Sequence, residues 1–562
     1  MTQLNNREKG KHAAEFPLAG LLLLLLIAYT GSAPFRHLYG LEARNALFAK
    51  EMLQNGFSLI PTALGKPYPD YPGLYFWIET FFSHFSGHVN TLSAVLPSSI
   101  FAVGSVVITF FLGCRINRQT GWFAAAILAT FPDFWLRASQ ATIDILLTFH
   151  VAAALACLFF GEESLSTRRM AYRIGAFFFM VLAFFTKGPI GIVLPAAAWG
   201  AYLLMERRFK SLFRFILISG MVAALCVAIQ LWIVWRTGGG HLIREVVISQ
   251  VTGRLGEKAN HPPYYYATTL LANGGIWLIM ALPAAGKWLR RKRDATWKDR
   301  GLAMLPGHPV TRIALIWFVI TFTIFTLAST RHTRYLLPLF PALAILIAYS
   351  IDGMLRRENN RFFFFGTVIS VLIAIILLAG VVAAIIFADR VFVPPACIAI
   401  WIVTVAWIWM ILKRRVEKGP RMVGLITLFL AAGLSGVNLL VIPQLSHRAS
   451  GRQFTEAAEA TVDPHIPVVL YRIGADGDGI KYALYSKRRP SALHFVKTKT
   501  ALKVIPPPYL LISPEGPHVP VWRAVLPGKI IVPLVHGKIR SHQFGAYLID
   551  ASSKPTDTHN IS

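Results

Sequence analysis

The sequence has 562 residues, of which 55% are hydrophobic and only 15% are charged, with a formal net charge of +29. A soluble globular protein carries about 25% charged residues and at most about 50% apolar ones, so this composition excludes an ordinary water-soluble enzyme. The positive charge lies mainly in short loops between apolar runs, which argues against nucleic acid as the partner. The four cysteines lie in or beside apolar runs without paired spacing, which argues against a disulfide framework or a metal site.

Apolar runs recur along the first 443 residues, and each is near the roughly 20 residues that cross the hydrocarbon core of a bilayer. A single run is compatible with a buried core helix, but a long series of them is not. We therefore expect a polytopic α-helical membrane protein with about 13 transmembrane helices, the first of them uncleaved. The runs lie near residues 16–30, 90–112, 120–135, 141–160, 171–185, 190–205, 211–235, 268–286, 311–328, 333–351, 362–387, 393–412 and 421–443.

Lysine and arginine gather in every second loop and in the N-terminal segment. Basic loops stay in the cytoplasm, so the pattern predicts a cytoplasmic N-terminus and loops that favour anionic membrane lipids. An odd number of spans then places the C-terminal domain outside. The basic loops lie near residues 115–118, 168–173, 207–214, 287–312, 356–361 and 413–421.

Three outer segments are long enough to carry function, namely residues 31–89, 237–267 and 444–562. We predict a transmembrane domain over 1–443 that includes the first two segments. The third changes composition sharply and alternates short apolar runs with Pro and Gly turns, so we predict a C-terminal soluble α/β domain over 444–562. A helix-like stretch covers Phe454–Val462.

The first outer segment contains two amphipathic stretches, Leu41–Leu53 and Leu74–Phe85, which predict interfacial helices. Between them, Gly65–Gly73 is a Pro-punctuated turn that holds a carboxylate beside aromatic side chains. In the C-terminal segment, Asp476–Gly479 weakly resembles a calcium loop. It lacks the remaining ligands, so we predict a plain turn there.

Charged side chains at membrane depth are costly and therefore mark functional sites. Carboxylates and cations from distant parts of the chain are expected on one side of the membrane, which suits a phosphorylated lipid and acid–base chemistry. An alternative is that Asp144 and Lys187 only pair across two helices. Neither a P-loop nor a Rossmann fingerprint is present, which argues against an ATP-driven pump. The candidates are Glu42, Asp70, Asp144, Lys187 and Arg334.

Six segments carry a resemblance to a known family. Their order resembles the lipid-linked-sugar glycosyltransferases of the GT-C fold, and more narrowly the bacterial branch of the protein O-mannosyltransferase superfamily, which includes the lipid A 4-amino-4-deoxy-L-arabinose transferases. Each motif is weak alone, but the six occur in the family's order and on the expected side of the membrane, which makes the resemblance specific. The matching segments are Glu42–Arg44 with Ala49–Met52 (D-E-x-R-Y…A-R-E-M), Gly65–Trp77 (Y-x-E-K-P-P-L-x-Y-W), Thr142–Thr148 (T-D-x-x-L-T), Phe185–Pro189 (L-T-K-G-P), Arg254 with His261–Tyr266 (R-F…H-x-x-P-W-Y-Y) and Arg334–Pro341 (Y-x-L-P-L-x-P).

The chain departs from the family pattern at three positions. Leu41 stands where the family has its leading aspartate, and Asn45 stands for a tyrosine. The family's E-K-P reads Asp70–Pro72, so the phosphate-binding lysine is replaced by Tyr71. The role of the leading carboxylate therefore falls to Glu42 as first choice, or to Asp70 or Asp144.

The resemblance implies transfer of a sugar from a polyprenyl-phosphate donor to lipid A or another lipid or glycan acceptor at the periplasmic face of a bacterial inner membrane. No nucleotide or cofactor is required, no metal site is predicted, and a divalent cation between Asp70 and His261 stays open because two ligands are too few. We expect a monomer. The residues that would bind the donor phosphate are Lys187, Arg254, Arg334 and Tyr335. The catalytic residues would be Glu42, Asp70 and Asp144. The substrate-binding residues would be Arg44, Tyr68, Tyr71, His261 and Tyr265.

Two other classes of function stay open. A transporter or flippase for lipid-linked sugars would more commonly show internal repeats, and we see no convincing repeat in the sequence. A non-catalytic homologue that assists envelope assembly would keep the fold without the chemistry. Unchanged turnover after neutralising each of the three candidate carboxylates in turn would favour one of these alternatives.

Overall fold

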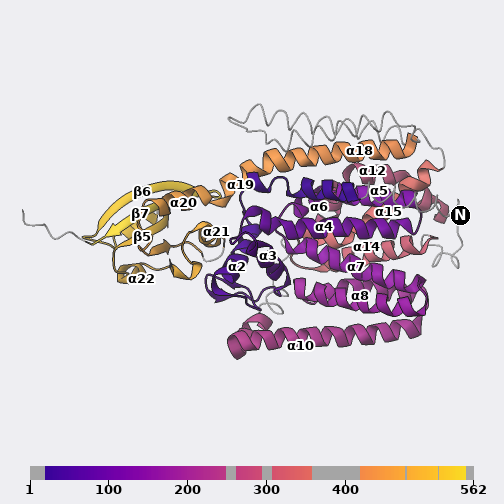
Figure 1. The fold of residues 1–562 in the computed structure, drawn as a ribbon, viewed down its shortest axis with the longest axis horizontal. Helices are drawn as coiled ribbons and strands as arrows, with labels where there is room; N and C mark the ends of the chain where they lie inside the picture. The colour runs from indigo at the N-terminus through magenta and orange to yellow at the C-terminus, as the bar shows by residue number, and fades with distance from the viewer. Residues whose placement is uncertain are drawn as a thin grey trace, which may run out of the picture. The chain divides into compact units, whose positions relative to one another are not determined.

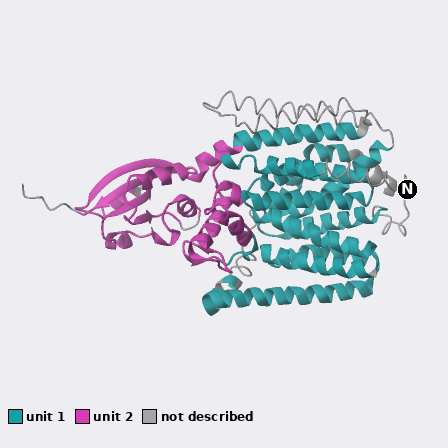
Figure 2. Ribbon diagram, viewed as in Figure 1, with its two compact units in different colours: residues 1–34, 69–75, 95–441 teal, residues 35–68, 76–94, 442–562 magenta. Residues whose placement is uncertain are grey.

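The structure is a computed structural model that describes residues 19–248, 261–293, 307–356, 418–474, 477–516 and 518–551 (Figure 1). Its contacts divide the chain into two compact units (Figure 2). Unit 1 comprises Met1–Pro34, Pro69–Tyr75 and Val95–Val441, and unit 2 comprises Phe35–Tyr68, Phe76–Ala94 and Ile442–Ser562. The predicted division at residue 443 assigned the whole first outer segment to the transmembrane domain, whereas most of that segment groups here with the C-terminal residues.

Unit 1 is helical, and the predicted apolar runs within the described residues form helices. Seven helices in the described part of the chain are long and apolar enough to cross a membrane, and Ala19–Phe35 and Ile190–Met205 are shorter apolar helices. The runs at 362–387 and 393–412 lie outside the described residues, so the total of 13 stays a prediction. The elements are α4 (Thr91–Cys114), α5 (Arg118–Ala129), α6 (Pro132–Ala138), α7 (Ile143–Glu163), α8 (Ser166–Lys187), α9 (Ile190–Met205), α10 (Phe209–Val247), α12 (Tyr265–Arg293), α14 (Pro309–Leu327), η3 (Thr333–Leu339), α15 (Phe340–Leu355) and α18 (Lys418–Gly436).

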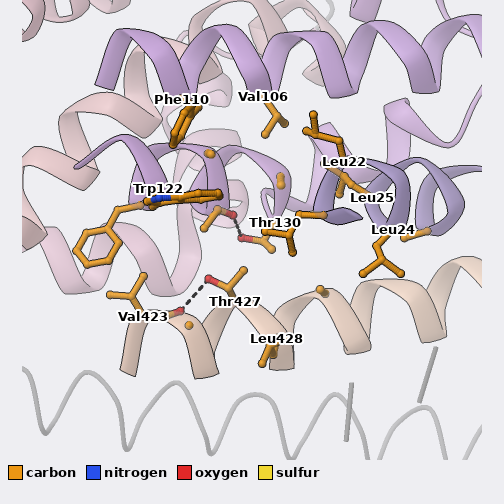
Figure 3. A pocket seen from close by; sticks show the side chains of 18 of the residues that line it. Leu22, Leu24, Leu25, Val106, Phe110, Trp122, Thr130, Val423, Thr427 and Leu428 are labelled. Atoms are coloured by element: carbon orange, nitrogen blue, oxygen red, sulfur yellow. Dashed lines mark hydrogen bonds between the residues drawn. The ribbon is translucent and has the colours of Figure 1, made fainter. Parts of the chain in front are cut away.

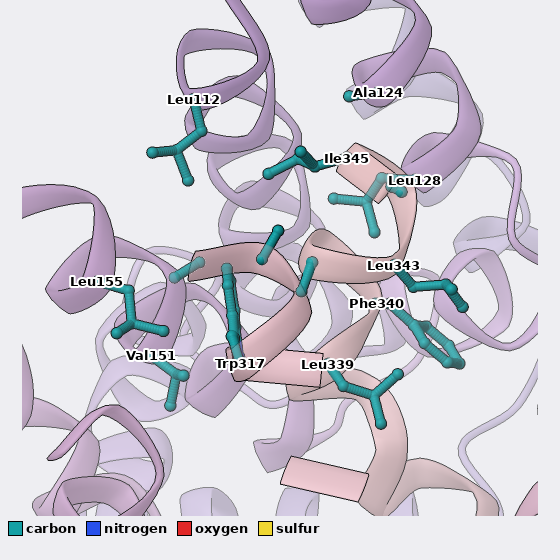
Figure 4. Close-up of a cluster of buried hydrophobic side chains, with 14 of the residues drawn as sticks. Leu112, Ala124, Leu128, Val151, Leu155, Trp317, Leu339, Phe340, Leu343 and Ile345 are labelled. Atoms are coloured by element: carbon teal, nitrogen blue, oxygen red, sulfur yellow. The ribbon is translucent and has the colours of Figure 1, made fainter. Parts of the chain in front are cut away.

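The core of unit 1 packs side chains from α4, α5, α7, α14 and α15 around Trp317 and Phe340 (Figure 4). Inside a bilayer the lipid is as apolar as the side chains, so helices associate through close packing, which small residues permit. Gly113 of α4 and Gly121 of α5 show this: a Cβ on Gly113 would lie 2.8 Å from the Cα of Gly121. A side chain at either position would force the two helices apart.

Unit 2 contains a five-stranded sheet in the order β4-β3-β5-β7-β6. Strands β4, β3 and β5 are parallel, and β7 pairs antiparallel with both β5 and β6. Both faces of the sheet carry a hydrophobic cluster, which explains why β3 and β5 have continuous rather than alternating apolar sequences. The strands are β3 (Val468–Tyr471), β4 (Leu493–Val496), β5 (Tyr509–Pro514), β6 (Ile530–Ile539) and β7 (His542–Asp550).

The helices of unit 2 include those predicted in the first outer segment. The expected Leu41–Leu53 and Leu74–Phe85 are confirmed as α2 (Leu41–Asn55) and α3 (Leu74–His84), and the expected Phe454–Val462 as α20 (Arg452–Ala460). The α/β character of the C-terminal segment is confirmed as well, whereas the interfacial position of α2 and α3 stays a prediction. The other elements are the hairpin β1 (Thr62–Ala63) and β2 (Lys66–Pro67) and the helices α19 (Ile442–Ser450), α21 (Asp478–Tyr485), α22 (Lys499–Val504) and α23 (His518–Arg523).

Helix α2 is part of the core of unit 2. Leu47 lies in the same buried cluster as Val468 and Leu510 of the sheet. The Lys50 ammonium donates hydrogen bonds to the carbonyl oxygens of Ala483, Leu484 and Ser486, at 2.9, 2.9 and 2.7 Å, at the end of α21. A cation at a helix C-terminus satisfies carbonyls that the helix leaves free. The first outer segment is thus tied to the C-terminal sheet by apolar and polar contacts.

The residues of the weak calcium-like motif have other partners. Asp478 accepts hydrogen bonds from Lys481 and His542, each at 2.8 Å, and residue 476 lies outside the described residues. Among the described residues, no group of three or more His, Cys, Asp or Glu side chains is placed to hold a metal. The partners of Asp478 give the motif a structural role at the start of α21.

Helix α3 buries a carboxyl group that has no hydrogen-bond partner among the described residues. Glu79 is fully buried on the same helix face as Phe76 and Ser83, and neither of its carboxyl oxygens has a hydrogen-bond partner within the described residues. Burial raises the pKa of Glu79 well above its usual value, and the nearby charge of Glu42 adds to the effect. Burial therefore favours the protonated, neutral form of Glu79.

The buried acid predicts a pH dependence of stability. The folded chain keeps the Glu79 proton to higher pH than the unfolded chain, whose Glu pKa is near 4.5. The free energy of unfolding contributed by this group therefore falls as the pH rises above that value. Glu79→Gln is neutral at every pH, so we expect it to raise the melting temperature at pH 8 and to change it little at pH 4.

Melting curves of the purified protein between pH 4 and 9 test this expectation. The matched control is Glu456→Gln, which removes an exposed carboxylate paired with Arg452 on α20. If the variant and the unchanged protein lose stability with pH in parallel, Glu79 does not carry the buried proton.

Candidate active site

Asp144 is the centre of a buried ionic cluster in unit 1. Its Oδ1 accepts a hydrogen bond from the Lys187 ammonium, and its Oδ2 lies 3.4 Å from Nε of Arg334. The three side chains are only 6%, 11% and 18% exposed, respectively. Thr142 also donates to Oδ2 at 3.2 Å. One carboxylate is therefore held by two cations and a hydroxyl in a largely dehydrated place.

Two neighbouring helices bring Asp144 and Lys187 together. Helix α7 begins at Ile143 with Thr142 as its N-cap, so Asp144 lies in the first turn, where the helix dipole favours a carboxylate. Helix α8 follows after a short connection and runs back. It ends at Lys187 because Gly188 adopts φ +79° and Pro189 follows. The cation thus lies at a helix C-terminus, beside the start of α7.

The third element is η3, which supplies Arg334 and Tyr335. The Lys187 ammonium lies 4.2 Å from the centre of the Tyr335 ring, and the Arg334 guanidinium lies 5.3 Å from it. Both cations therefore lie near the same aromatic ring, an arrangement that stabilises a charge removed from water. Predicted as separate candidates, Asp144, Lys187, Arg334 and Tyr335 form a single cluster.

Helix α6 adds a second ion pair that the sequence reasoning missed. Arg137 donates to Asp133 at 3.2 Å and to Gln140 at 2.9 Å, and its charge interacts with Asp144. The signal in the sequence is the i, i+4 spacing of Asp133 and Arg137 between two apolar runs. With Lys187 and Arg334, the cations outnumber the carboxylates by one. An excess of positive charge in a poorly hydrated site attracts an anion such as phosphate.

The loop before α12 is tied to the loop before η3. Arg331 is buried and donates to the carbonyl oxygens of His261 and Thr326, and the amide of His332 donates to the Tyr266 hydroxyl at 3.2 Å. The rings of His261 and Tyr265 stack at 4.1 Å. Two predicted substrate-binding residues therefore lie together on a braced loop. Arg254 lies outside the described residues.

The other predicted residues have different surroundings. In unit 2, Glu42 accepts hydrogen bonds from both terminal nitrogens of Arg36, at 2.8 and 2.7 Å, in a pair that is almost fully buried. Arg44, also in unit 2, donates to the Tyr68 hydroxyl at 3.4 Å and lies over the same ring. In the unit 1 segment Pro69–Tyr75, Asp70 is exposed and Tyr71 is half-buried. The catalytic and binding roles assigned to these residues stay predictions.

A large apolar cavity of about 910 Å³ also lies in unit 1 (Figure 3). Helix α6 connects it to the ionic cluster, because Trp135 lines the cavity while Asp133 and Arg137 of the same helix lie in the cluster. Arg118 is the one charged side chain in the lining that the structure describes. The remaining lining is mainly aliphatic and aromatic, with Leu22 and Leu25 before α4, Val106 and Phe110 of α4, Trp122 of α5 and Val423 of α18.

Comparison with known sequences finds glycosyltransferases that are similar to this chain. The dolichyl-phosphate-mannose-protein mannosyltransferase family profile matches residues 70–235, which include Asp144 and Lys187. An undecaprenyl phosphate-alpha-4-amino-4-deoxy-L-arabinose arabinosyl transferase of Pectobacterium carotovorum is 27% identical over 324 residues, which cover 56% of this chain and 55% of that protein. A transferase of the same description from Sodalis glossinidius is 28% identical over 347 residues, covering 59% of each chain. The match thus spans little more than half the length of these relatives.

Comparison with solved structures extends over nearly the whole chain. The crystal structure of ArnT from Cupriavidus metallidurans bound to undecaprenyl phosphate covers 94% of this chain and 97% of its own, with a TM-score of 0.71 and 17% sequence identity. The apo structure of the same protein gives the same TM-score and identity. At this identity the likeness establishes the fold. The chain is a multi-pass membrane protein with the GT-C fold of lipid-linked-sugar glycosyltransferases, and it is similar to the aminoarabinose transferases among them.

Proposed function

We propose that this protein transfers a sugar from a polyprenyl-phosphate donor to a hydroxyl group of a bacterial envelope acceptor, with 4-amino-4-deoxy-L-arabinose and lipid A as the first pair to test. The observation that carries the proposal is the buried cluster of Asp144, Lys187 and Arg334, which combines a carboxylate with an excess of positive charge. The similarity to named arabinosyl transferases and the fold shared with an ArnT bound to undecaprenyl phosphate support it.

The cations of the cluster are the groups that would bind the donor phosphate. Without a donor they neutralise Asp144, and a phosphate with its larger charge competes for the same two side chains. When the sugar leaves the donor, negative charge develops on the phosphate oxygen. Lys187 and Arg334, which both lie near the Tyr335 ring, stabilise that charge in a site from which water is largely excluded.

Asp144 then becomes the general base. Once Lys187 and Arg334 turn to the phosphate, the Asp144 carboxylate accepts the proton of the acceptor hydroxyl. The hydroxyl oxygen attacks the anomeric carbon, the bond from that carbon to the phosphate oxygen breaks, and polyprenyl phosphate leaves. The sequence favours Glu42 for this task, but Glu42 pairs with the single cation Arg36 in unit 2, whereas Asp144 lies among the cations that suit the phosphate. We therefore assign Glu42 to positioning α2.

The lipid portion of the donor is assigned to the apolar cavity. The cavity is lined mainly by apolar side chains. One of them is Trp135 of α6, the helix that also carries Asp133 and Arg137 of the ionic cluster. A polyprenyl chain placed along α5 and α18 would bring its phosphate toward Arg137 and Lys187. We place the cluster on the periplasmic side, because it lies at the ends of α7 and α8 opposite the basic residues 168–173.

One prediction separates the catalytic role of Asp144 from the phosphate-binding role of Lys187. We expect Asp144→Asn to lower kcat by about a hundredfold or more, the contribution of a general base. We expect Lys187→Ala to raise KM for the donor by about tenfold, the value of one buried charge-assisted contact. Both are measured with purified protein in nanodiscs, the undecaprenyl-phosphate aminoarabinose donor and lipid A.

The control for Asp144→Asn is Asp352→Asn, which removes a buried carboxylate bound to Asn117 and Arg356 elsewhere on unit 1. Glu42→Gln is a poor test alone, because breaking the buried pair of Arg36 and Glu42 destabilises the fold by about 3–5 kcal/mol. Asp144→Asn with kcat within threefold of the unchanged protein would move the base elsewhere. Donor movement across the bilayer without sugar transfer would favour the transporter class.

The second prediction concerns the cavity. Thr427→Trp places a large ring among the residues that line it, so we expect weaker binding of a long polyprenyl chain and unchanged binding of a short one. Because the chain can also lie in surrounding lipid, the effect is modest, about three- to tenfold in donor KM. The measurement compares C55 and C10 donors. Leu217→Trp, on an exposed position of α10, is the control. Equal effects on both donors would exclude the cavity as the chain site.

A further inference from the structure

Unit 2 contains a second pocket, of about 630 Å³, between α19, α20 and β6. Its apolar lining residues, which we call the floor, are Phe454, Ala457 and Val535. Its polar and basic lining residues form the rim, and no aspartate or glutamate of the described residues lines it. The rim residues are His447, Arg448, Gln453, His536, Lys538 and Arg540.

Two glycines give the pocket its shape. A Cβ on Gly537 of β6 would lie 2.7 Å from the Phe454 ring, and a Cβ on Gly451 would lie 2.9 Å from the Ile539 side chain. Gly451 also has φ +75°, a conformation that favours glycine. Helix α20 therefore lies directly on β6, which is an edge strand of the sheet. The floor is fixed by this packing rather than by mobile side chains.

The positive charge of the rim is not neutralised by neighbours. Arg448, Lys538 and Arg540 are exposed, and none of them has a salt bridge within the described residues. His536 differs, since its Nδ1 lies 2.7 Å from Glu515. Several exposed cations that line one pocket give it a positive potential, which favours an anionic ligand.

A neighbouring histidine reports the same electrostatic environment. The His37 ring lies 4.0 Å from the His447 ring. Burial is the main cause that lowers the pKa of His37 to about 4, and electrostatic interactions with His447 and Arg452 add to it. The second contribution agrees with the excess of basic side chains at the pocket.

The combination of floor and rim selects the class of ligand. A pocket of this volume is in the range of small-molecule sites, about 300–1,000 Å³, and is too large for an inorganic anion alone. Two arginines suit the paired oxygens of a phosphate group, and the apolar floor suits the face of a sugar ring. We propose that this pocket binds a phosphorylated saccharide, presented either as the headgroup of a glycolipid or as a soluble sugar phosphate.

The proposal goes beyond the transfer reaction and is tested without a donor. The full chain in phosphatidylcholine nanodiscs is titrated with glucose 1,6-bisphosphate by calorimetry. Because a single exposed ion pair contributes little, the three cations are removed together, and we expect Arg448→Ala, Lys538→Ala and Arg540→Ala combined to weaken binding by about tenfold or more. The control combines Lys497→Ala, Lys499→Ala and Lys503→Ala, which remove three exposed cations outside the pocket.

The outcomes separate a site from general attraction. Binding that falls in the pocket variant and stays within threefold in the control supports the proposal, provided that both variants melt like the unchanged protein. Absence of binding, an equal loss in both variants, or equally tight binding of inorganic phosphate would overturn it. A glycolipid with a phosphorylated sugar headgroup, added to the nanodisc, distinguishes the two sources. Displacement of the soluble ligand assigns the pocket to the membrane headgroup, and no displacement assigns it to the free sugar phosphate.

Discussion

The ion pair between Asp144 and Lys187 is the interaction on which the candidate site depends. A carboxylate at the edge of a membrane helix is unfavourable unless it is neutralised, and here two cations and a hydroxyl surround it. The same contacts join the start of α7, the end of α8 and η3. These cations are also the groups suited to a phosphate. A phosphorylated substrate would therefore compete with Asp144 for Lys187 and Arg334. Structure and proposed function thus use the same charges.

A second constraint acts in unit 2. Helix α2 belongs to the first outer segment, yet its Leu47 and Lys50 contact residues more than 400 positions later in the chain. The buried pair of Arg36 and Glu42 fixes the start of the same helix. Breaking a buried pair leaves an unpaired charge, which is far more costly than losing an exposed one. A residue that matches a family motif can therefore be required for folding rather than for chemistry.

The candidate site was predictable in its parts. The cost of charge at membrane depth identifies Asp144, Lys187 and Arg334 from the sequence, and all three lie in one cluster. Asp133 and Arg137 were missed because a short helix between two apolar runs resembles the end of a span. Glu79 was missed because a single carboxylate in an aromatic helix is expected to face water. Only the structure shows that the helix face carrying Glu79 is buried. Which side chains pair with one another depends on distances in space, and the spacing of residues along the chain does not give these distances.

The sequence alone determined the membrane helices, the α/β class of the C-terminal domain and the two helices of the first outer segment. These follow from local properties, namely hydropathy, periodicity and turn residues. Only the tertiary structure decided that α2 packs into the core of unit 2, that Glu42 is held by Arg36, and that a basic pocket forms between α20 and β6. Each of these is a contact between segments far apart in the chain. Many arrangements satisfy the same hydropathy pattern, and packing and charge pairing select one of them.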